Sequence, residues 1–437
     1  MDSSPNPSPR LAPHTRIAII GGGPAGSFFA LSALHSAAPL NLPLDITLFE
    51  RKDLTAAGPR GCNMCAGILS HRVLQGLDRL NISLPPEIIL GRVRTYLLHW
   101  RDHAIGVQPP DPARQVISVY RAGGPRKSPY APTQGLDEFL LQQAQTRGAR
   151  VIHERVERIS FDPLPIVRTA SNDAEFDLVV LATGVNATPP ILDSVDYVLP
   201  KTETMAQDSL LIETDLTRIQ MESTVHVYFD QPRDLIFGAL VPKGKFATVS
   251  LLGRHLERNS LSQFLNIPEV TAVVGNLPPQ MCGCRPRVSI APSRGYYANR
   301  FVAIGDSCVT RLYKDGIGSA LATAHAAAET ALLYGIERQA FAEHYAPICR
   351  RIDADNQFGR FIFGLIAHSK RNAYFMRGLG RALKIELRDP PPARILSGTL
   401  WALFTGDSNY AEISRMLLNP RGLARLCNGM LKQFSSH

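Results

Sequence analysis

The sequence lacks long apolar runs: nowhere in its 437 residues do about 18 apolar residues follow one another, so no transmembrane helix is expected. Residues 1–15 are rich in proline and serine and contain no apolar core, which predicts a disordered tail and no signal peptide. With only 7 cysteines and no secretory signal, the chain is expected in a reducing, cytoplasmic compartment. Internal repeats and nucleic-acid-binding motifs are also missing, so we expect no nucleic acid partner.

The overall composition, with 45% hydrophobic and 19% charged residues, is typical of a soluble enzyme with two or three substructures. The formal net charge of +9 gathers near the C-terminal end, where residues 357–437 hold 12 Lys or Arg and 4 Asp or Glu. Between residues 410 and 434 apolar residues recur at helical spacing, and Pro420 splits them into two short helices. This pattern is typical either of a helical cap with a solvated basic face or of a peripheral contact with an anionic membrane surface.

The first informative motif lies near the N-terminus, where an apolar strand at residues 16–20 meets a glycine turn and a helix over 25–35. Gly21 permits the tight turn, Gly23 lets the backbone approach a pyrophosphate, and Gly26 allows the helix to pack closely on the strand. A second strand, residues 45–49, ends at an acid that can bind the ribose hydroxyls. The predicted dinucleotide contacts of this unit are Gly21, Gly23, Pro24, Ala25, Gly26, Glu50 and Arg51.

Two later strands end in glycine turns of the same kind. Residues 301–304 form a buried strand that ends in Gly305-Asp306, and after a loop Gly316-Ile317-Gly318 opens an alanine-rich helix that extends to residue 333. The strand at 177–182 ends in Thr183-Gly184. Because the carboxyl ends of parallel strands share one edge of a sheet, these turns are expected beside the first phosphate site.

With these three units in order, residues 14–340 resemble the FAD-dependent oxidoreductases of the p-hydroxybenzoate hydroxylase type. The resemblance implies non-covalent FAD and an α/β fold: a Rossmann-like FAD-binding domain, an interleaved antiparallel-sheet substrate domain and a C-terminal helical region. Asp306 would then hold the FAD ribityl chain. The domain boundaries that we expect are 1–15 for the tail, 16–90 with 121–197 and 286–340 for the FAD-binding domain, 91–120 with 198–285 for the substrate domain, and 341–437 for the helical region.

Two further segments resemble the geranylgeranyl reductase family, flavoenzymes that saturate prenyl double bonds. They are Cys65-Ala66-Gly67 and the loop from Gly305 to Gly318. The resemblance implies a hydrophobic, prenyl-like or lipid substrate, a catalytic Cys65, and backbone N–H groups of Gly316 and Gly318 directed at the flavin. Arg121 precedes a predicted helix at 134–147 and is also expected to contact the flavin. Lys314 and Asp315 are candidates for proton transfer or for polarising the flavin.

The chain departs from that family at several positions, which keeps other functions open. Residues 237–242 retain Pro242 but lack the family's tyrosine and tryptophan, and Tyr313 stands where a proline is expected. A flavin monooxygenase and an electron-transfer or redox-sensing flavoprotein are the alternatives. A flavin halogenase is not expected, because the two tryptophans, Trp100 and Trp401, form no Trp-x-Trp motif. No second complete GxGxxG unit is present, so transient NAD(P)H, a ferredoxin or a quinol remain candidate electron donors.

Four cysteines form two close pairs, Cys62 with Cys65 and Cys282 with Cys284. If the pairs meet, four thiolates suit a tetrahedral zinc ion. In a second interpretation the thiols form a dithiol that exchanges electrons with the flavin. In a third they are packed in the protein and take part in no chemistry.

Overall fold

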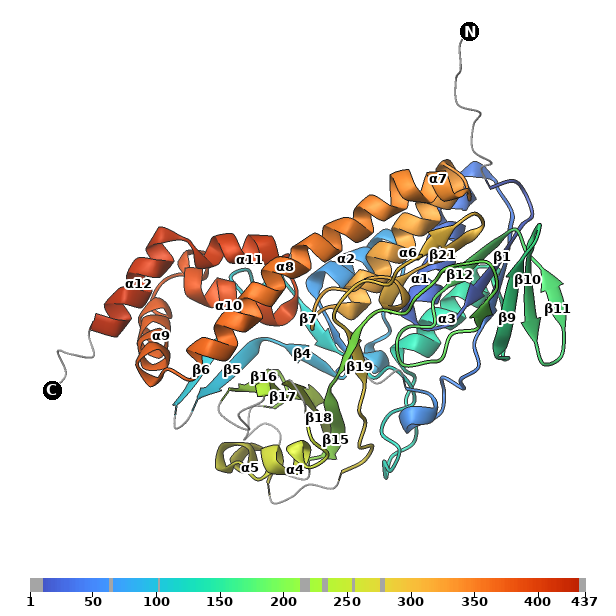
Figure 1. Cartoon of the computed structure of the whole chain (residues 1–437). Helices are drawn as coiled ribbons and strands as arrows, with labels where there is room; N and C mark the ends of the chain where they lie inside the picture. The colour runs from blue at the N-terminus through green and yellow to red at the C-terminus, as the bar shows by residue number, and fades with distance from the viewer. Residues whose placement is uncertain are drawn as a thin grey trace, which may run out of the picture.

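The structure is a computed structural model that describes residues 11–62, 66–100, 103–212, 221–229, 235–253, 256–275 and 280–431. Two large sheets lie side by side, and a row of helices runs along both of them to the C-terminal end (Figure 1). Residues 11–15, which the sequence assigned to a disordered tail, take part in the fold. Leu11 is buried, the His14 amide donates to the Pro43 carbonyl, and the first strand already begins at Thr15.

The first sheet has six strands in the order β20-β21-β12-β1-β2-β8, all parallel except β20. Apolar runs form its central strands because both faces are covered, as is usual for parallel sheets. The strands are β1 (Thr15–Ile20), β2 (Leu44–Phe49), β8 (Arg150–Ile152), β12 (Leu178–Leu181), β20 (Tyr297–Ala298) and β21 (Phe301–Ala303).

Helix α1 (Pro24–Ala37) packs between α3 (Leu136–Thr146) and α6 (Gly316–Leu333). The α1–α6 contact is extensive because the buried face of α6 consists largely of alanines, which let the two backbones approach closely. Helix α2 (His71–Arg79) packs on α6 as well. A smaller sheet contacts the first one through the ring pairs Phe161–Phe301 and Phe49–Phe176. It consists of β9 (Val156–Phe161), β10 (Pro165–Thr169), β11 (Asp173–Glu175) and β13 (Ile191–Leu192).

The second large sheet has the order β15-β18-β17-β16-β5-β6 and is antiparallel except where β16 pairs with β5. Every residue of β16, β17 and β18 is buried. Helices α4 (Ser260–Leu265) and α5 (Pro268–Val274) lie on one face and the C-terminal helices on the other. The strands are β5 (Thr95–Trp100), β6 (His103–Val107), β15 (Ala206–Leu211), β16 (Thr224–Tyr228), β17 (Leu235–Lys243) and β18 (Phe246–Gly253).

Short strands connect the two large sheets. One small sheet is formed by β3 (Ile68–Leu69), β7 (Val116–Ser118) and β4 (Gly91–Val93). Where the chain passes from the first large sheet to the second and later returns, β14 (Thr202–Thr204) pairs with β19 (Arg287–Ser289). These crossings bring the carboxyl ends of the first sheet close to one face of the second.

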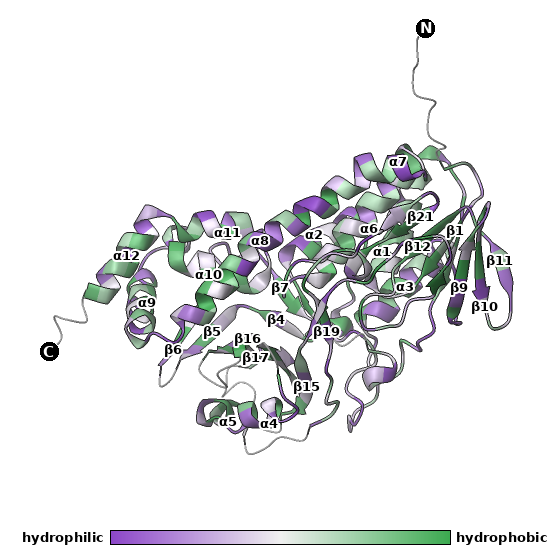
Figure 2. Cartoon of the chain, in the orientation of Figure 1, coloured by the Kyte–Doolittle hydropathy of each residue, from purple (hydrophilic) through white to green (hydrophobic). Residues whose placement is uncertain are grey.

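The C-terminal helices cover the second sheet, and Figure 2 shows their hydrophobic residues interleaved with hydrophilic ones. These helices are α8 (Ala346–Ser369), α9 (Ala373–Glu386), α10 (Ile395–Thr405), α11 (Tyr410–Leu417) and α12 (Pro420–Leu431), whereas the short α7 (Arg338–Ala340) lies near the first sheet (Figure 1). The predicted split is confirmed, since α12 begins at Pro420. Over the described ranges, no helix is both long and apolar enough to cross a membrane.

The packing of α11 on α8 predicts opposite effects at two glycines of α8. A β-carbon at Gly359 would lie 2.7 Å from the Tyr410 ring, whereas one at Gly364 would meet no atom within 4 Å. Gly359→Ala should therefore lower the free energy of unfolding by about 1–3 kcal/mol through overpacking. Gly364→Ala, the matched control, should raise it by about 0.5–1 kcal/mol through helix propensity. Chemical denaturation measures both values, and equal effects would contradict this packing.

Candidate functional site

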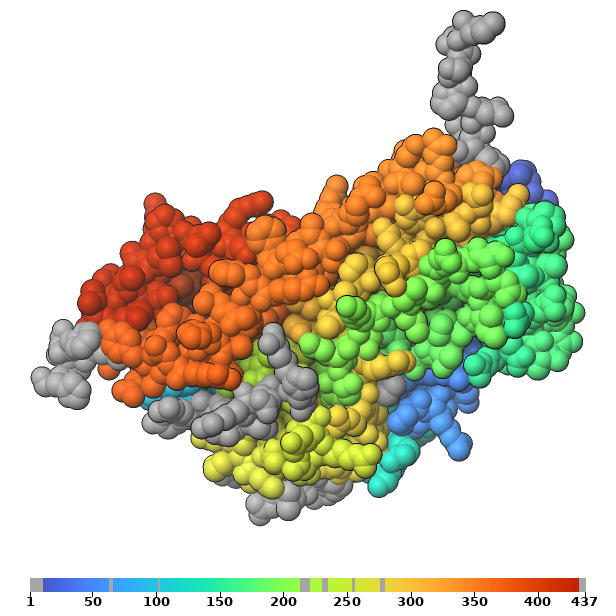
Figure 3. Space-filling view, viewed as in Figure 1, coloured from blue at the N-terminus to red at the C-terminus, as the bar shows by residue number. Residues whose placement is uncertain are grey.

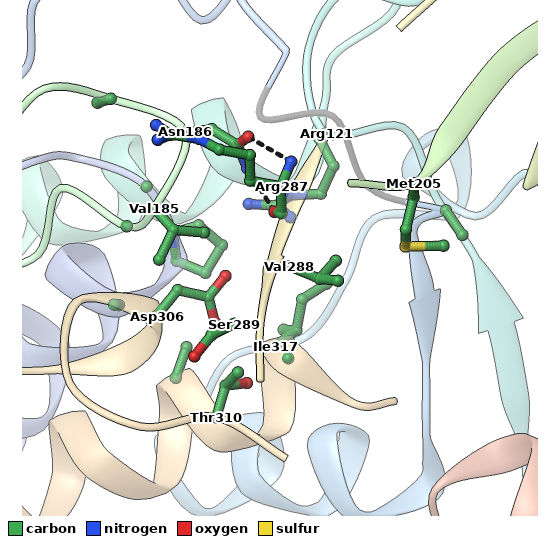
Figure 4. Close-up of a pocket in the computed structure, with 18 of the residues that line it drawn as sticks. Arg121, Val185, Asn186, Met205, Arg287, Val288, Ser289, Asp306, Thr310 and Ile317 are labelled. Carbon is green, nitrogen blue, oxygen red and sulfur yellow. Dashed lines mark hydrogen bonds between the residues drawn. The ribbon is translucent and has the colours of Figure 1, made fainter. Parts of the chain in front are cut away.

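A cavity of about 310 Å³ lies between the carboxyl ends of the first sheet and one face of the second. Figure 4 shows side chains from both halves directed into it, among them Arg121, Met205, Val288, Asp306 and Ile317. Of the residues predicted to bind a dinucleotide or to act on it, those that line the cavity are Gly21, Gly23, Pro24, Ala25, Glu50, Arg51, Arg121, Thr183, Gly184, Asp306, Lys314, Asp315, Gly316 and Ile317.

The N-terminus of α1 opens onto this cavity. A β-carbon at Gly26 would lie 1.9 Å from the Gly21 carbonyl oxygen, so only glycine allows the helix to start this close to β1. Gly23 is the N-cap, no side chain caps the helix, and its first turn contains no acidic residue. Unpaired N–H groups and the positive end of the helix dipole therefore face the cavity, which is the arrangement that binds phosphate.

Glu50 lies at the end of β2, beside the glycine turn. Its Oε2 accepts a hydrogen bond from the Gly22 amide at 2.8 Å, and its Oε1 accepts one from the Lys52 amide at 2.7 Å. Each carboxylate oxygen retains a further lone pair for a ribose hydroxyl. Burial lowers the pKa of Lys52, a cavity residue that the sequence reasoning missed.

Arg121 and Asp306 place opposite charges along the cavity. Arg121 Nη2 donates to Asp137 Oδ2 at 2.9 Å, and this buried pair with α3 fixes the guanidinium. Burial raises the pKa of Asp306, while the Arg121 charge opposes that shift. Gly305 does not line the cavity: a β-carbon there would lie 2.7 Å from the Ala25 side chain, so this glycine lets the Asp306 turn approach α1.

The loop between Asp306 and α6 is strained. Tyr313 and Asp315 both have positive φ angles, 61° and 54°, which are uncommon for residues other than glycine. Arg311 has Nε and Nη2 buried with no hydrogen-bond partner among the described residues, and it lines the cavity. A loop held in this conformation next to unpaired donors is typical of a site prepared for a ligand.

Lys314 and Asp315 differ in what surrounds them. Lys314 Nζ lies 4.5 Å from the Phe237 ring centroid, and burial lowers its pKa to about 7. Asp315 accepts a hydrogen bond from Ser70 Oγ at 3.3 Å, and burial raises its pKa to about 6. Gly318 is not among the residues that line the cavity, and the flavin contact of its amide stays a prediction.

The structure describes three of the four cysteines in the two predicted pairs. Cys65 lies outside the described residues, so its catalytic role stays a prediction. Cys62, Cys282 and Cys284 are close enough to influence one another electrostatically. Within the described parts of the chain, no group of three His, Cys, Asp or Glu residues is arranged to hold a metal ion.

Several cavity residues gave no signal in the sequence. Phe404 comes from α10, far along the chain, and reaches the cavity because the C-terminal helices pack on the second sheet. Asn186 fixes the Arg287 backbone by two hydrogen bonds, from Arg287 N to Oδ1 at 2.8 Å and from Nδ2 to the Arg287 carbonyl at 3.1 Å (Figure 4). Neither residue belongs to a recognisable motif, so only the fold could identify them.

A second cavity of about 240 Å³ lies behind Phe404, between the second sheet and the helices α8, α9 and α10. Phe404 lines both cavities. Most residues of the second cavity are apolar, including Leu98, Trp100, Ile105, Phe229, Ile366, Phe375, Met376, Leu379, Leu383, Leu400 and Leu403. Phe404 therefore stands between the first cavity and a second, largely apolar space that suits a hydrocarbon chain.

No known family model matches the sequence, and no curated protein matches it. Solved structures do share its fold. A geranylgeranyl bacteriochlorophyll reductase-like protein from Thermoplasma acidophilum superposes with a TM-score of 0.64 at 16% identity, over 96% of this chain and 100% of that one.

Two other flavoprotein structures are similar over nearly the whole chain. A mutant of the halogenase PltM in complex with FAD has a TM-score of 0.59 at 13% identity, covering 97% of this chain and 96% of that one. The p-nitrophenol 4-monooxygenase PnpA from Pseudomonas putida has a TM-score of 0.56 at 13% identity, covering 95% of this chain and 99% of that one. The predicted p-hydroxybenzoate hydroxylase-type fold is confirmed.

Proposed function

We propose that this chain is an FAD-dependent oxidoreductase that saturates a carbon–carbon double bond of an extended apolar, prenyl-like substrate. The observation that carries the proposal is the position of the Lys314 amine at the border of the two cavities. Its Nζ lies 4.5 Å from the centroid of the Phe237 ring and 5.5 Å from that of Phe404. A proton donor between aromatic rings, with an apolar cavity behind them, suits the reduction of a hydrocarbon double bond.

The residues around the first cavity fit FAD. The open N-terminus of α1 would hold the pyrophosphate, Glu50 the adenosine ribose and Asp306 the ribityl chain. Gly184 lines the same cavity, and a β-carbon there would meet no atom within 4 Å. Its backbone therefore borders open space that FAD could occupy. When bound, the reduced flavin supplies a hydride equivalent.

Lys314 is the better candidate for the accompanying proton transfer. Its ammonium group can deliver a proton to the second carbon of the double bond, and a pKa of about 7 keeps it partly protonated near neutral pH. Asp315 instead occupies the N-cap position of α6 and accepts a hydrogen bond from Ser70 Oγ. We therefore assign Asp315 to holding the strained loop that positions Lys314.

A monooxygenase is the alternative, because the same fold occurs in a p-nitrophenol 4-monooxygenase. The apolar second cavity favours the reductase, since a small phenolic substrate would not need it. Photoreduction without oxygen, followed by mixing with a polyisoprenoid alcohol or with oxygen, separates the two. A reductase is reoxidised by the alkene and releases a saturated product, whereas a monooxygenase is reoxidised only by oxygen and releases a hydroxylated one.

The FAD assignment predicts which side chains retain the cofactor. The purified protein should be yellow, and Gly23→Val should lose most FAD because a side chain would occupy the pyrophosphate position. Asp306→Ala should weaken FAD binding about 10–100-fold, through loss of a charge-assisted hydrogen bond. The control is Asp78→Ala, an exposed aspartate of α2. Flavin absorbance of the purified variants gives the result, and full occupancy in both cavity variants would refute the assignment.

The proton-transfer role predicts a pH dependence. Because Lys314 must be protonated to act and its pKa is about 7, alkene reduction in a single turnover should slow about tenfold per unit as pH rises above 7. Lys314→Met should remove this dependence and slow the step about 10²–10⁴-fold. FAD occupancy should stay unchanged.

The matched control is Lys245→Met, which removes a lysine that lies over the Tyr130 ring outside the cavity. This variant should keep both the rate and the pH profile of the wild type. An unchanged pH profile in Lys314→Met would exclude Lys314 as the proton donor.

We also infer that the end of the molecule formed by α9 and α12 contacts membranes peripherally, where an apolar substrate would reside. Figure 3 shows the C-terminal helices forming one continuous end of the surface. Leu423 and Leu431 are 42% and 61% exposed there and lie two helical turns apart on α12, with Arg421 also exposed. Exposed leucines beside basic residues are typical of helices that rest on anionic lipid.

Replacing both Leu423 and Leu431 with serine should weaken binding to anionic liposomes by about tenfold or more, because buried leucine side chains contribute most to such binding. The matched control changes Leu40 and Leu333, exposed leucines in the part of the molecule that contains the first sheet, to serine. Added salt should weaken binding of the intact chain. Intact protein that stays free of anionic liposomes at low salt would contradict the contact.

A further inference from the structure

The turn Cys282-Gly283-Cys284 follows α5 and is held tightly against β15. The Cys284 amide donates to the Gln207 carbonyl at 2.7 Å, and the Gln207 amide donates back at 2.8 Å. The Cys282 amide donates to Asp208 Oδ1 at 2.7 Å. Gly283 has a φ of +67°, a conformation that glycine adopts readily, and this bends the chain so that the two thiols meet. We call these three residues the thiol turn.

The Cys282 sulfur is surrounded by donors. It accepts a hydrogen bond from the Arg126 amide at 3.4 Å, and the Cys284 thiol one residue beyond Gly283 is a second donor that lowers the Cys282 pKa. Two donors directed at one sulfur stabilise its thiolate form, and the pKa of Cys282 is lowered to about 7. The Arg126 charge favours this shift, while burial and the Asp208 carboxylate oppose it.

Cys284 has the opposite character. The hydrogen bond that it gives to Cys282 raises its own pKa, and burial and the neighbouring Cys62 raise it further. Cys284 therefore keeps its proton while Cys282 tends to lose its own. Both residues are half-buried and neither is in a disulfide, so a small reagent can reach them.

The thiol turn pairs with β15, a strand that contributes Gln207 to the first cavity. Gln207 lines that cavity and donates from Nε2 to Ser250 Oγ at 2.8 Å. Cys284 is the antiparallel bridge partner of Gln207, and residues directly opposite each other in such a pair point to the same face. Peroxide formed when a reduced flavin meets oxygen would thus reach the thiols over a short path.

We propose that the thiol turn is a peroxide-reactive dithiol site, in which Cys282 is the nucleophile and Cys284 the resolving thiol. This activity goes beyond the proposed reduction of a double bond. The Cys282 thiolate attacks a hydroperoxide oxygen: an S–O bond forms, the O–O bond breaks, and the leaving hydroxide takes up a proton. Cys284 then attacks the Cys282 sulfur, the S–S bond forms and the S–O bond breaks. The second hydroxide leaves with the Cys284 proton, so two thiols are oxidised and hydrogen peroxide is reduced to two waters.

The test treats the full chain with hydrogen peroxide, blocks remaining thiols by alkylation and measures the tryptic peptide of residues 259–287. In the wild type this peptide should lose the mass of two hydrogen atoms and regain it with a dithiol reductant. Cys284→Ser should instead form a sulfenic acid on Cys282, trapped by dimedone, because no resolving thiol remains. Cys282→Ser should form neither product.

Cys427 provides the control, since it is exposed and lies on α12, away from the thiol turn. Cys427→Ser should leave the mass change intact, and Cys427 should oxidise about tenfold more slowly than Cys282 because it lacks that pair of donors. The wild-type measurement needs no variant, so it stands even if a substitution prevents folding. A peptide of unchanged mass while Cys427 oxidises would overturn the proposal. Stoichiometric zinc that is lost in Cys282→Ser would overturn it too.

Discussion

The contact between Gly26 and the Gly21 carbonyl oxygen determines where everything else in the site can lie. A β-carbon at Gly26 would come within 1.9 Å of that oxygen, so α1 starts directly at the end of β1 only because the residue is glycine. The Asp306 turn approaches the same helix through Gly305, where a β-carbon would lie 2.7 Å from Ala25. The N-terminus of α1 and the Asp306 carboxylate thus face one cavity, while β2 brings Glu50 to its edge.

Side chains from the second half of the chain determine which reactions this cavity can support. The strained loop from Tyr313 to Asp315 directs Lys314 between Phe237 of the second sheet and Phe404 of α10. Behind Phe404 the surroundings become apolar. Because one fold supports reductases, halogenases and oxygenases, the function of the chain depends on these side chains and their environment.

The sequence predicted what is local and the structure supplied what depends on long-range packing. Glycine turns, the strands before them and the helix break at Pro420 follow from backbone geometry, which nearby residues determine. Phe404, the second cavity and the complete burial of β16 could not be predicted, because they require the C-terminal helices to pack on a sheet made from distant segments.

A crystal structure of the protein with FAD tests the central claim most directly. The account predicts the pyrophosphate at the N-terminus of α1 beside Gly23, the ribityl chain at Asp306, and the isoalloxazine next to Lys314 with one edge toward Phe404. FAD bound outside this cavity, or with its ring system directed away from Lys314, would contradict it.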